Sequence, residues 1–116
     1  MKELCVQFDL QDDKYFTALR LVAGAICNLA QKDVDSSEDF KVCVSESALI
    51  LKNNGYSSVK ALFSANGGAQ AVICGEGKIN GVSGDNELSL ALIGALVDSC
   101  DFKEEDGVIS SVTLKI

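Results

Sequence analysis

Between residues 40 and 56 the apolar positions recur at the spacing of an α-helix. One stripe consists of Phe40, Val44, Ala48 and Leu51. Further apolar residues fill both flanks of this stripe, so the pattern predicts a helix that is buried on most sides. The sequence Asn53-Asn54-Gly55 predicts its end, because glycine readily takes the left-handed conformation that follows a helix. We expect this central helix to organise the fold.

One carboxylate, Glu46, lies at the centre of this apolar segment. A carboxylate in such a place needs a partner, a cavity or a chemical task. Three interpretations remain open: a general base, a carboxylate satisfied by neighbours in a pocket, or a group that faces solvent or a partner. Ser45 and Ser47 flank it and could form local hydrogen bonds, although adjacent helix positions do not face each other.

Elsewhere the pattern alternates between strand-like and helix-like periods. It predicts strands over residues 3–9, 57–64, 69–74, 99–105 and 108–116, and helices over residues 15–31 and 87–97. Asn66-Gly67-Gly68 and Asp106-Gly107 mark hairpin turns, and residues 75–84 form a glycine-rich loop. The expected helix caps are Asp12 or Asp13, a residue within 36–39, and Asp85 or Asn86.

The predicted order of elements is β-α-α-β-β-α-β-β. Short hairpin connections favour a mixed, mostly antiparallel sheet, and three apolar helices suffice to cover one of its faces. This indicates an α/β (α+β) two-layer sandwich that forms a single domain over residues 1–116.

Composition excludes several classes of function. The net charge of −7 argues against a nucleic-acid partner, which would need a basic surface. No apolar run is long enough to cross a membrane without charges, and residues 1–10 lack the apolar core of a secretory signal, so a cytoplasmic protein without a membrane partner is expected.

The chain contains no histidine, which excludes Ser-His-Asp and Cys-His nucleophilic sites. The five cysteines are scattered, with no C-x-x-C pair, so a zinc site is not expected. We interpret these cysteines, Cys5, Cys27, Cys43, Cys74 and Cys100, as small hydrophobic residues of the interior.

The central helix carries Val44-Ser45-Glu46, followed after eight intervening residues by Gly55-Tyr56. This pattern resembles the nucleotide-binding helix of the anti-sigma factor serine-protein kinases. They belong to the Bergerat-fold (GHKL) ATPase superfamily, which also holds the histidine kinases. The similarity in element order and spacing extends over nearly the whole chain, including Leu96-Val97-Asp98 and the closing hairpin.

The resemblance implies a site whose diagnostic residues are degenerate. Glu46 matches the general base, but the fourth residue after it is Ile50, where the family has an asparagine that binds Mg²⁺. Gly75, before Glu76 and Gly77, takes the place of the aspartate that accepts a hydrogen bond from adenine, so this acceptor is missing unless Glu76 replaces it after a shift of register. The phosphate-binding glycine box corresponds to Glu87-Leu88-Ser89, where a carboxylate would repel a triphosphate, and the lid before it is short.

The resemblance therefore implies a regulatory domain that binds a sigma factor or an anti-sigma-factor antagonist, without bound ATP, cofactor or metal and without kinase activity. One alternative is an active ATP- and Mg²⁺-dependent serine-protein kinase that uses Glu46, with Asn53, Asn54 or Asn80 as Mg²⁺ ligands. Another is an accessory or oligomerisation domain of a two-component or sigma-regulatory system, which could form a homodimer. Residues 75–84 are interpreted as a shortened connection, and the carboxylates of residues 98–106 as a solvated edge or a docking face.

Overall fold

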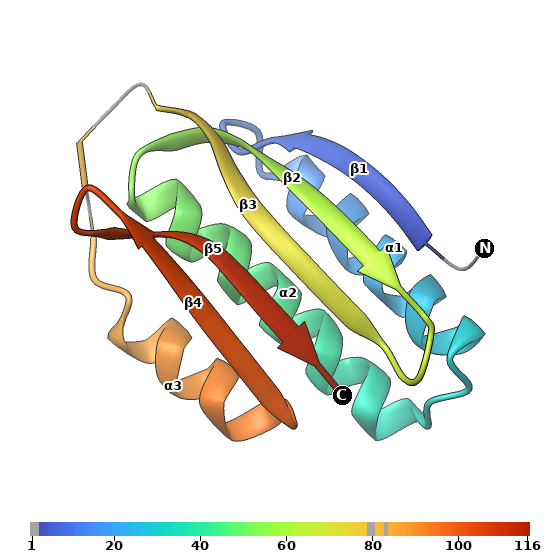
Figure 1. Ribbon diagram of the computed structural model, residues 1–116. Coiled ribbons are helices and arrows are strands. Elements are labelled where there is room, and N and C mark those ends of the chain that lie inside the picture. The colour runs from blue at the N-terminus through green and yellow to red at the C-terminus, as the bar shows by residue number, and fades with distance from the viewer. Residues whose placement is uncertain (1–2, 79–80, 83) are drawn as a thin grey trace.

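The computed structural model describes residues 3–78, 81–82 and 84–116, arranged as one sheet with helices on one side (Figure 1). The strands are β1 (Glu3–Asp9), β2 (Tyr56–Ser64), β3 (Gln70–Lys78), β4 (Ser99–Glu105) and β5 (Val108–Lys115), and the helices are α1 (Lys14–Leu29), α2 (Val34–Asn53) and α3 (Glu87–Leu96). Their order along the chain is the predicted one.

The five strands form one sheet in the order β1-β2-β3-β5-β4. Every pairing among the described strands is antiparallel, so the sheet is antiparallel throughout and not mixed. Figure 1 shows α1, α2 and α3 on the same side of this sheet, which gives the two-layer α+β sandwich that the pattern predicts.

Helix α2 lies across the middle of the sheet and supplies the centre of the core. Its stripe of Phe40, Val44, Ala48 and Leu51 is completely buried. From the sheet, Phe63, Ile73 and Leu114 meet this helix and are also completely buried. Alternate residues of each strand point to opposite faces, so these three side chains define the covered face of the sheet.

The start of α2 differs from the prediction. The helix begins at Val34, and its N-cap is Asp33, whose Oδ1 accepts a 2.7 Å hydrogen bond from the Ser36 amide. The predicted cap within residues 36–39 is therefore wrong. The turn of α2 before Phe40 does not pack on the core, so it carries no apolar stripe. The hydrophobic pattern therefore predicts a helix that begins too late. The predicted end is confirmed, with Gly55 at a φ of 96°.

Strand β3 is longer than predicted and includes Gly75, Glu76 and Gly77, which the sequence places in a loop. Glu76 pairs with Ser58 and Gly75 pairs with Val59 in the ladder with β2. The predicted loop over residues 75–84 is thus wrong for its first residues. Backbone pairing with a long neighbouring strand outweighs the weak strand preference of glycine here.

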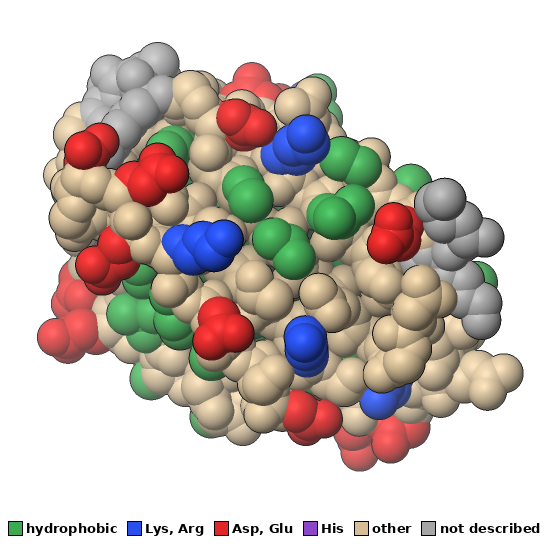
Figure 2. Space-filling model, in the orientation of Figure 1, with side chains coloured by type: hydrophobic (Ala, Val, Ile, Leu, Met, Phe, Trp, Pro, Cys, Tyr) green, Lys and Arg blue, Asp and Glu red, His purple; other side chains and the backbone are tan. Residues whose placement is uncertain are grey.

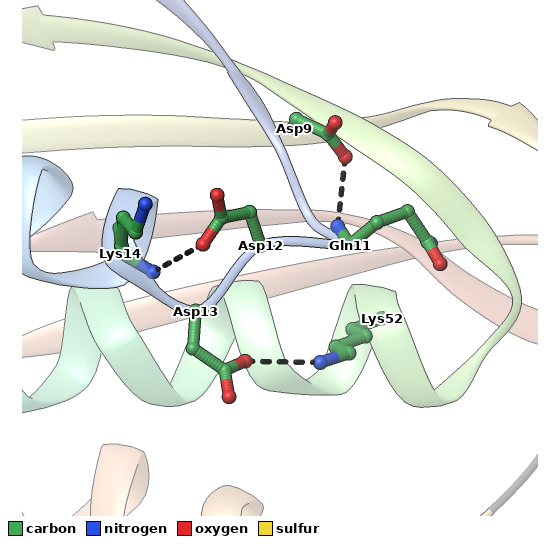
Figure 3. A network of polar contacts seen from close by, with 6 residues as sticks. All are labelled: Asp9, Gln11, Asp12, Asp13, Lys14 and Lys52. Carbon is green, nitrogen blue, oxygen red and sulfur yellow. Dashed lines mark hydrogen bonds and ion pairs between the residues drawn. The ribbon is translucent and has the colours of Figure 1, made fainter.

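The turn between β1 and α1 is tied to the end of α2 (Figure 3). Asp13 is the N-cap position of α1 but has no capping hydrogen bond; instead its carboxylate lies 3.2 Å from Nζ of Lys52. Asp12 accepts from the amide of Lys14, and Asp9 accepts from the amide of Gln11. The ion pair is exposed, so it positions the turn more than it stabilises the fold.

The second face of the sheet carries no helix among the described residues. Figure 2 views this face and shows a small apolar group over the middle strands, surrounded by lysines and carboxylates. Among the described residues, no helix combines the length and hydropathy that crossing a membrane requires.

Candidate functional site

Glu46 lies at the seam between α2 and α3, close to one hydroxyl of α3. The Ser89 Oγ donates a 3.4 Å hydrogen bond to Oε1 of Glu46. Ser89 is 4% exposed, whereas Glu46 is half-buried at the edge of the seam. Of the three interpretations of Glu46, this contact best agrees with a carboxylate satisfied by a neighbouring hydroxyl.

The residues near Glu46 on α2 either pack into the core or form hydrogen bonds within the helix. Ile50, one turn further on, is completely buried and offers no oxygen. Ser47 Oγ donates a 2.7 Å hydrogen bond to the carbonyl of Cys43. Ser45 Oγ is buried and has no hydrogen-bond partner among the described residues. Neither serine hydroxyl bonds to Glu46 there.

Three asparagines join the end of α2 to the start of α3 and to β5. Asn53 Nδ2 donates to Oδ1 of Asn86 at 3.1 Å, and Asn86 Nδ2 donates to Oδ1 of Asn54 at 3.0 Å. Asn54 Nδ2 donates in turn to the carbonyl of Ile109 at 2.9 Å. Asn54 is only 2% exposed, so this chain of bonds satisfies a buried amide and holds α3 against α2.

Sequence reasoning missed this network. It considered Asn86 only as a helix cap and Asn53 and Asn54 only as a helix end or as Mg²⁺ ligands. Asn86 is the N-cap residue of α3, but its side chain makes no capping bond. The pattern held no signal for the network, since its members are 32 and 33 residues apart along the chain. The third possible ligand, Asn80, lies outside the described residues.

Gly75 lies against an aromatic ring and is not free to approach a ligand closely. A Cβ added at Gly75 would lie 2.5 Å from ring atoms of Tyr56, and one added at Gly77 would lie 2.7 Å from Oγ of Ser57. Ser57 Oγ itself donates a 3.0 Å hydrogen bond to the carbonyl of Gly77. Both glycines therefore have a packing role within the β2–β3 ladder.

Glu76 is separated from Glu46 by the sheet. Strand alternation places Glu76 on the same face as Val72 and Cys74, opposite the completely buried Ile73. Glu87 is exposed in the first turn of α3, where its amide donates to Oδ1 of Asp85. Of the residues assigned to the degenerate nucleotide boxes, the structure brings only Ser89 into contact with Glu46.

The α3 side of α2 is rich in negative charge. Burial, together with the nearby Asp39, Cys100 and Glu46, raises the pKa of the Cys43 thiol to about 12. Asp39, Cys43 and Glu46 recur at i, i+4 and i+7, so they lie on the same side of α2. Among the described residues, no group of three or more histidine, cysteine or acidic side chains is placed to hold a metal ion.

The cysteines differ in burial more than their interpretation as interior residues suggests. Cys27 and Cys43 are buried, Cys74 and Cys100 are half-buried and Cys5 is exposed; all five are free thiols. Cys5 has this exposure because β1 is an edge strand and the residue points to the uncovered face, opposite its neighbours Leu4 and Val6.

Four hollows along the described residues lie away from Glu46. The two on the helical side lie between α1 and the first half of α2, with volumes of about 420 Å³ and 210 Å³. The third, of about 490 Å³, adjoins the turn after β1, and the fourth, of about 290 Å³, includes residues of β3, β4 and β5. None of these four is lined by Glu46, Ile50 or Ser89.

No protein-family model matches the chain, and no curated protein is significantly similar to it.

Proposed function

We propose that this chain is a regulatory protein-binding domain of the anti-sigma-factor type, which acts by binding a sigma factor or an anti-sigma-factor antagonist and not by phosphorylating it. The type of partner comes from the resemblance of Val44-Ser45-Glu46 and Gly55-Tyr56 to the nucleotide-binding helix of that family. The packing between α2 and α3 supports the second part of the proposal, that the domain does not use a nucleotide.

The packing of α3 directly against α2 carries the proposal. Ser89 and Ile93 of α3 are 4% and 0% exposed, and Ile50 of α2 is 0% exposed. The Ser89 hydroxyl lies on the Glu46 carboxylate, where a general base would need a substrate hydroxyl beside a Mg²⁺-bound triphosphate. A nucleotide would have to displace α3 and break the hydrogen bonds of Asn86.

The positions of the remaining boxes support the same proposal. Glu76 points to the opposite face of the sheet, and Gly75 packs on Tyr56. Glu87 adds a negative charge to the first turn of α3, where the partial positive charge of the helix start would otherwise attract a phosphate.

Thermal unfolding with millimolar Mg-ATP or Mg-ADP tests the proposal directly. A ligand present at about 100 times its Kd would stabilise the fold by about 2.7 kcal/mol, which is several degrees for a domain of this size. We expect no shift from either nucleotide. A clear shift that Glu46→Gln or Asn86→Ala alters would instead favour an ATP-dependent serine-protein kinase.

The binding half of the proposal needs a separate measurement. The protein is mixed with purified sigma factors and antagonists and analysed by size-exclusion chromatography, with and without Mg-ATP. We expect a stable complex with one of them, unaffected by ATP. Complex formation that requires ATP, or self-association alone, would contradict this proposal; the latter would favour an oligomerisation domain.

A further inference from the structure

Helix α3 presents an exposed apolar face to solvent. Leu88 is 72% exposed and is followed on the same face by Ala91 and Ala95, which are also exposed. These residues recur at i, i+3 and i+7, so they form one continuous stripe along the helix. Gly94 borders the stripe, and no atom lies within 4 Å of a Cβ added there. This surface therefore combines one large side chain, that of Leu88, with a row of small residues that leaves the helix backbone accessible.

Such a surface suits a second helix. Small side chains allow a helix to approach closely, and an exposed leucine at one end can enter the groove of a partner. The buried side of α3 is already occupied, since Ser89 and Ile93 pack against α2. The apolar stripe is therefore not needed for the core of this domain.

The charges on α3 and on the segments that flank it in sequence are of one sign. No lysine or arginine occurs between Lys78 and Lys103, whereas this interval contains four carboxylates. Glu87 and Asp98 lie at the two ends of α3 and are exposed, as is Asp85 just before it. The left edge of Figure 2, where α3 and the β4–β5 hairpin lie in Figure 1, shows carboxylates and apolar side chains.

Helix α2 continues the same negative border. Asp39 and Glu46 recur at i and i+7 on this helix, and Glu46 accepts a hydrogen bond from Ser89 of α3, so both lie on its α3 side. The lysines of α2 lie on the other side: Lys41 packs over Gly24 of α1, and Lys52 pairs with Asp13 at 3.2 Å. The two lysines of α2 therefore lie next to α1, where Glu38 pairs with Lys41 at 3.0 Å, whereas Asp39 and Glu46 lie next to α3.

We propose that the exposed face of α3 binds an amphipathic helix of a partner protein, in which lysines or arginines flank the apolar residues. This inference rests on the proposed function, since it names the surface and the partner chemistry of that binding domain. The carboxylates Glu46, Glu87 and Asp98 receive the basic side chains, and Leu88 supplies the apolar anchor. A second copy of this chain is a poor occupant, because a two-fold contact would place equal negative borders against each other.

A pair of model peptides tests this surface on the intact protein. Each is an amphipathic helix of about 18 residues with leucines on one face, long enough to match α3. One carries lysines on the polar face and the other carries glutamates at the same positions. Binding is measured by fluorescence anisotropy at low and at high salt. We expect the lysine peptide to bind and the glutamate peptide not to, with affinity falling as salt screens the carboxylates.

Two variants with the same change in charge locate the binding. Leu88→Lys alters the proposed face, and Leu21→Lys alters a leucine of α1 that is 69% exposed. We expect Leu88→Lys to weaken the lysine peptide about tenfold or more, and Leu21→Lys to leave its affinity within about twofold. Unchanged thermal midpoints would show that both variants fold. Equal effects of the two variants, equal binding of both peptides, or no binding at millimolar peptide would overturn the inference.

The remaining outcomes separate this inference from the proposed function. If a sigma factor or antagonist binds Leu88→Lys as tightly as the unaltered chain, the α3 face is wrong while the binding function stands. If Mg-ATP shifts the melting temperature but the peptide results hold, the proposed absence of nucleotide chemistry is wrong while the docking face stands. If sedimentation shows a dimer that Leu88→Lys dissociates, the occupant is a second copy and the inference fails.

Discussion

The side chains of Asn54 and Asn86 meet across the end of α2 and the start of α3, with the Asn86 amide 3.0 Å from Oδ1 of Asn54. Asn54 is almost completely buried, and its Nδ2 donates a second hydrogen bond to the carbonyl of Ile109 in β5. These hydrogen bonds connect α2, which covers the centre of the sheet, with α3, whose outer face is exposed to solvent. They make the attachment of α3 dependent on polar contacts as well as on packing.

Replacement of Asn86 by alanine should loosen α3. The substitution leaves the buried Oδ1 of Asn54 without its donor, and an unsatisfied buried group costs about 1–3 kcal/mol. Chemical denaturation should show a loss of this size, and hydrogen exchange should show faster exchange in α3 than in α1. Asn66→Ala, in the exposed turn between β2 and β3, is the matched control and should change the stability by no more than about 0.5 kcal/mol. Equal protection of α3 in both variants would contradict this role.

Gly75→Ala should destabilise the fold, because the added methyl group would lie 2.5 Å from the ring of Tyr56. Overpacking of this kind costs about 1–3 kcal/mol. Gly94→Ala is the opposite case, since its Cβ would meet no atom within 4 Å and α3 would gain a better helix former, worth about 0.5–1 kcal/mol.

A double-mutant cycle identifies the ring as the cause. The free energy of unfolding lost through Gly75→Ala should shrink when Tyr56→Ala removes the ring. The same loss in both backgrounds would mean that the strand conformation, not the ring, requires glycine at this position.

The sequence predicts the elements well where their pattern reflects burial in the core. Strand β1 covers the predicted residues 3–9, and the stripe of α2 from Phe40 to Leu51 is buried as expected. The first turn of α2 was missed because Asp33 begins a polar turn that covers no core. The end of β3 was missed because pairing with β2, which is not local in sequence, keeps two glycines in a strand.

The candidate site was less accessible to sequence reasoning. The position of Glu46 at the centre of α2 could be predicted, but its contact with Ser89 spans 43 residues of sequence. The direction of the Glu76 side chain follows from its place in β3, which the sequence analysis did not predict because it placed residues 75–84 in a loop. The bridging role of Asn86 depends on the packing of two helices, which periodicity does not report.

The cysteines should differ sharply in reactivity. Cys5 is exposed, whereas Cys27 and Cys43 are buried and burial raises the pKa of both buried thiols. A thiol reagent at pH 8 should modify Cys5 first, and should modify Cys27 and Cys43 at least about 100-fold more slowly, since they become accessible only on unfolding. Mass spectrometry of timed samples assigns the sites, and Cys5→Ala should remove the fast phase alone. Early modification of Cys43 would mean that α2 opens locally.

Stability should fall as the pH rises above about 9. In the unfolded chain the Cys43 thiol ionises near its ordinary pKa of 9.0, whereas in the fold its pKa is about 12. The folded state therefore holds a proton that the unfolded state has lost, and the free energy of unfolding decreases between these values, by at most about 1.4 kcal/mol per pH unit. Tyr56, whose pKa burial also raises, acts in the same direction above its ordinary value of 10.0.

Cys43→Ala isolates the contribution of this thiol. The variant should be less stable than the unaltered protein at pH 8, because it leaves a small cavity, but its stability should fall less steeply between pH 9 and 11. Urea unfolding at several pH values under reducing conditions measures both effects, and Cys5→Ala, at an exposed position, should keep the full slope. Because Asp39, Cys100 and Glu46 add to the effect of burial, Glu46→Gln should lower the pKa of Cys43 slightly and weaken the dependence in the same sense. An identical slope in Cys43→Ala and in the unaltered protein would assign the alkaline loss to Tyr56 or to the lysines instead.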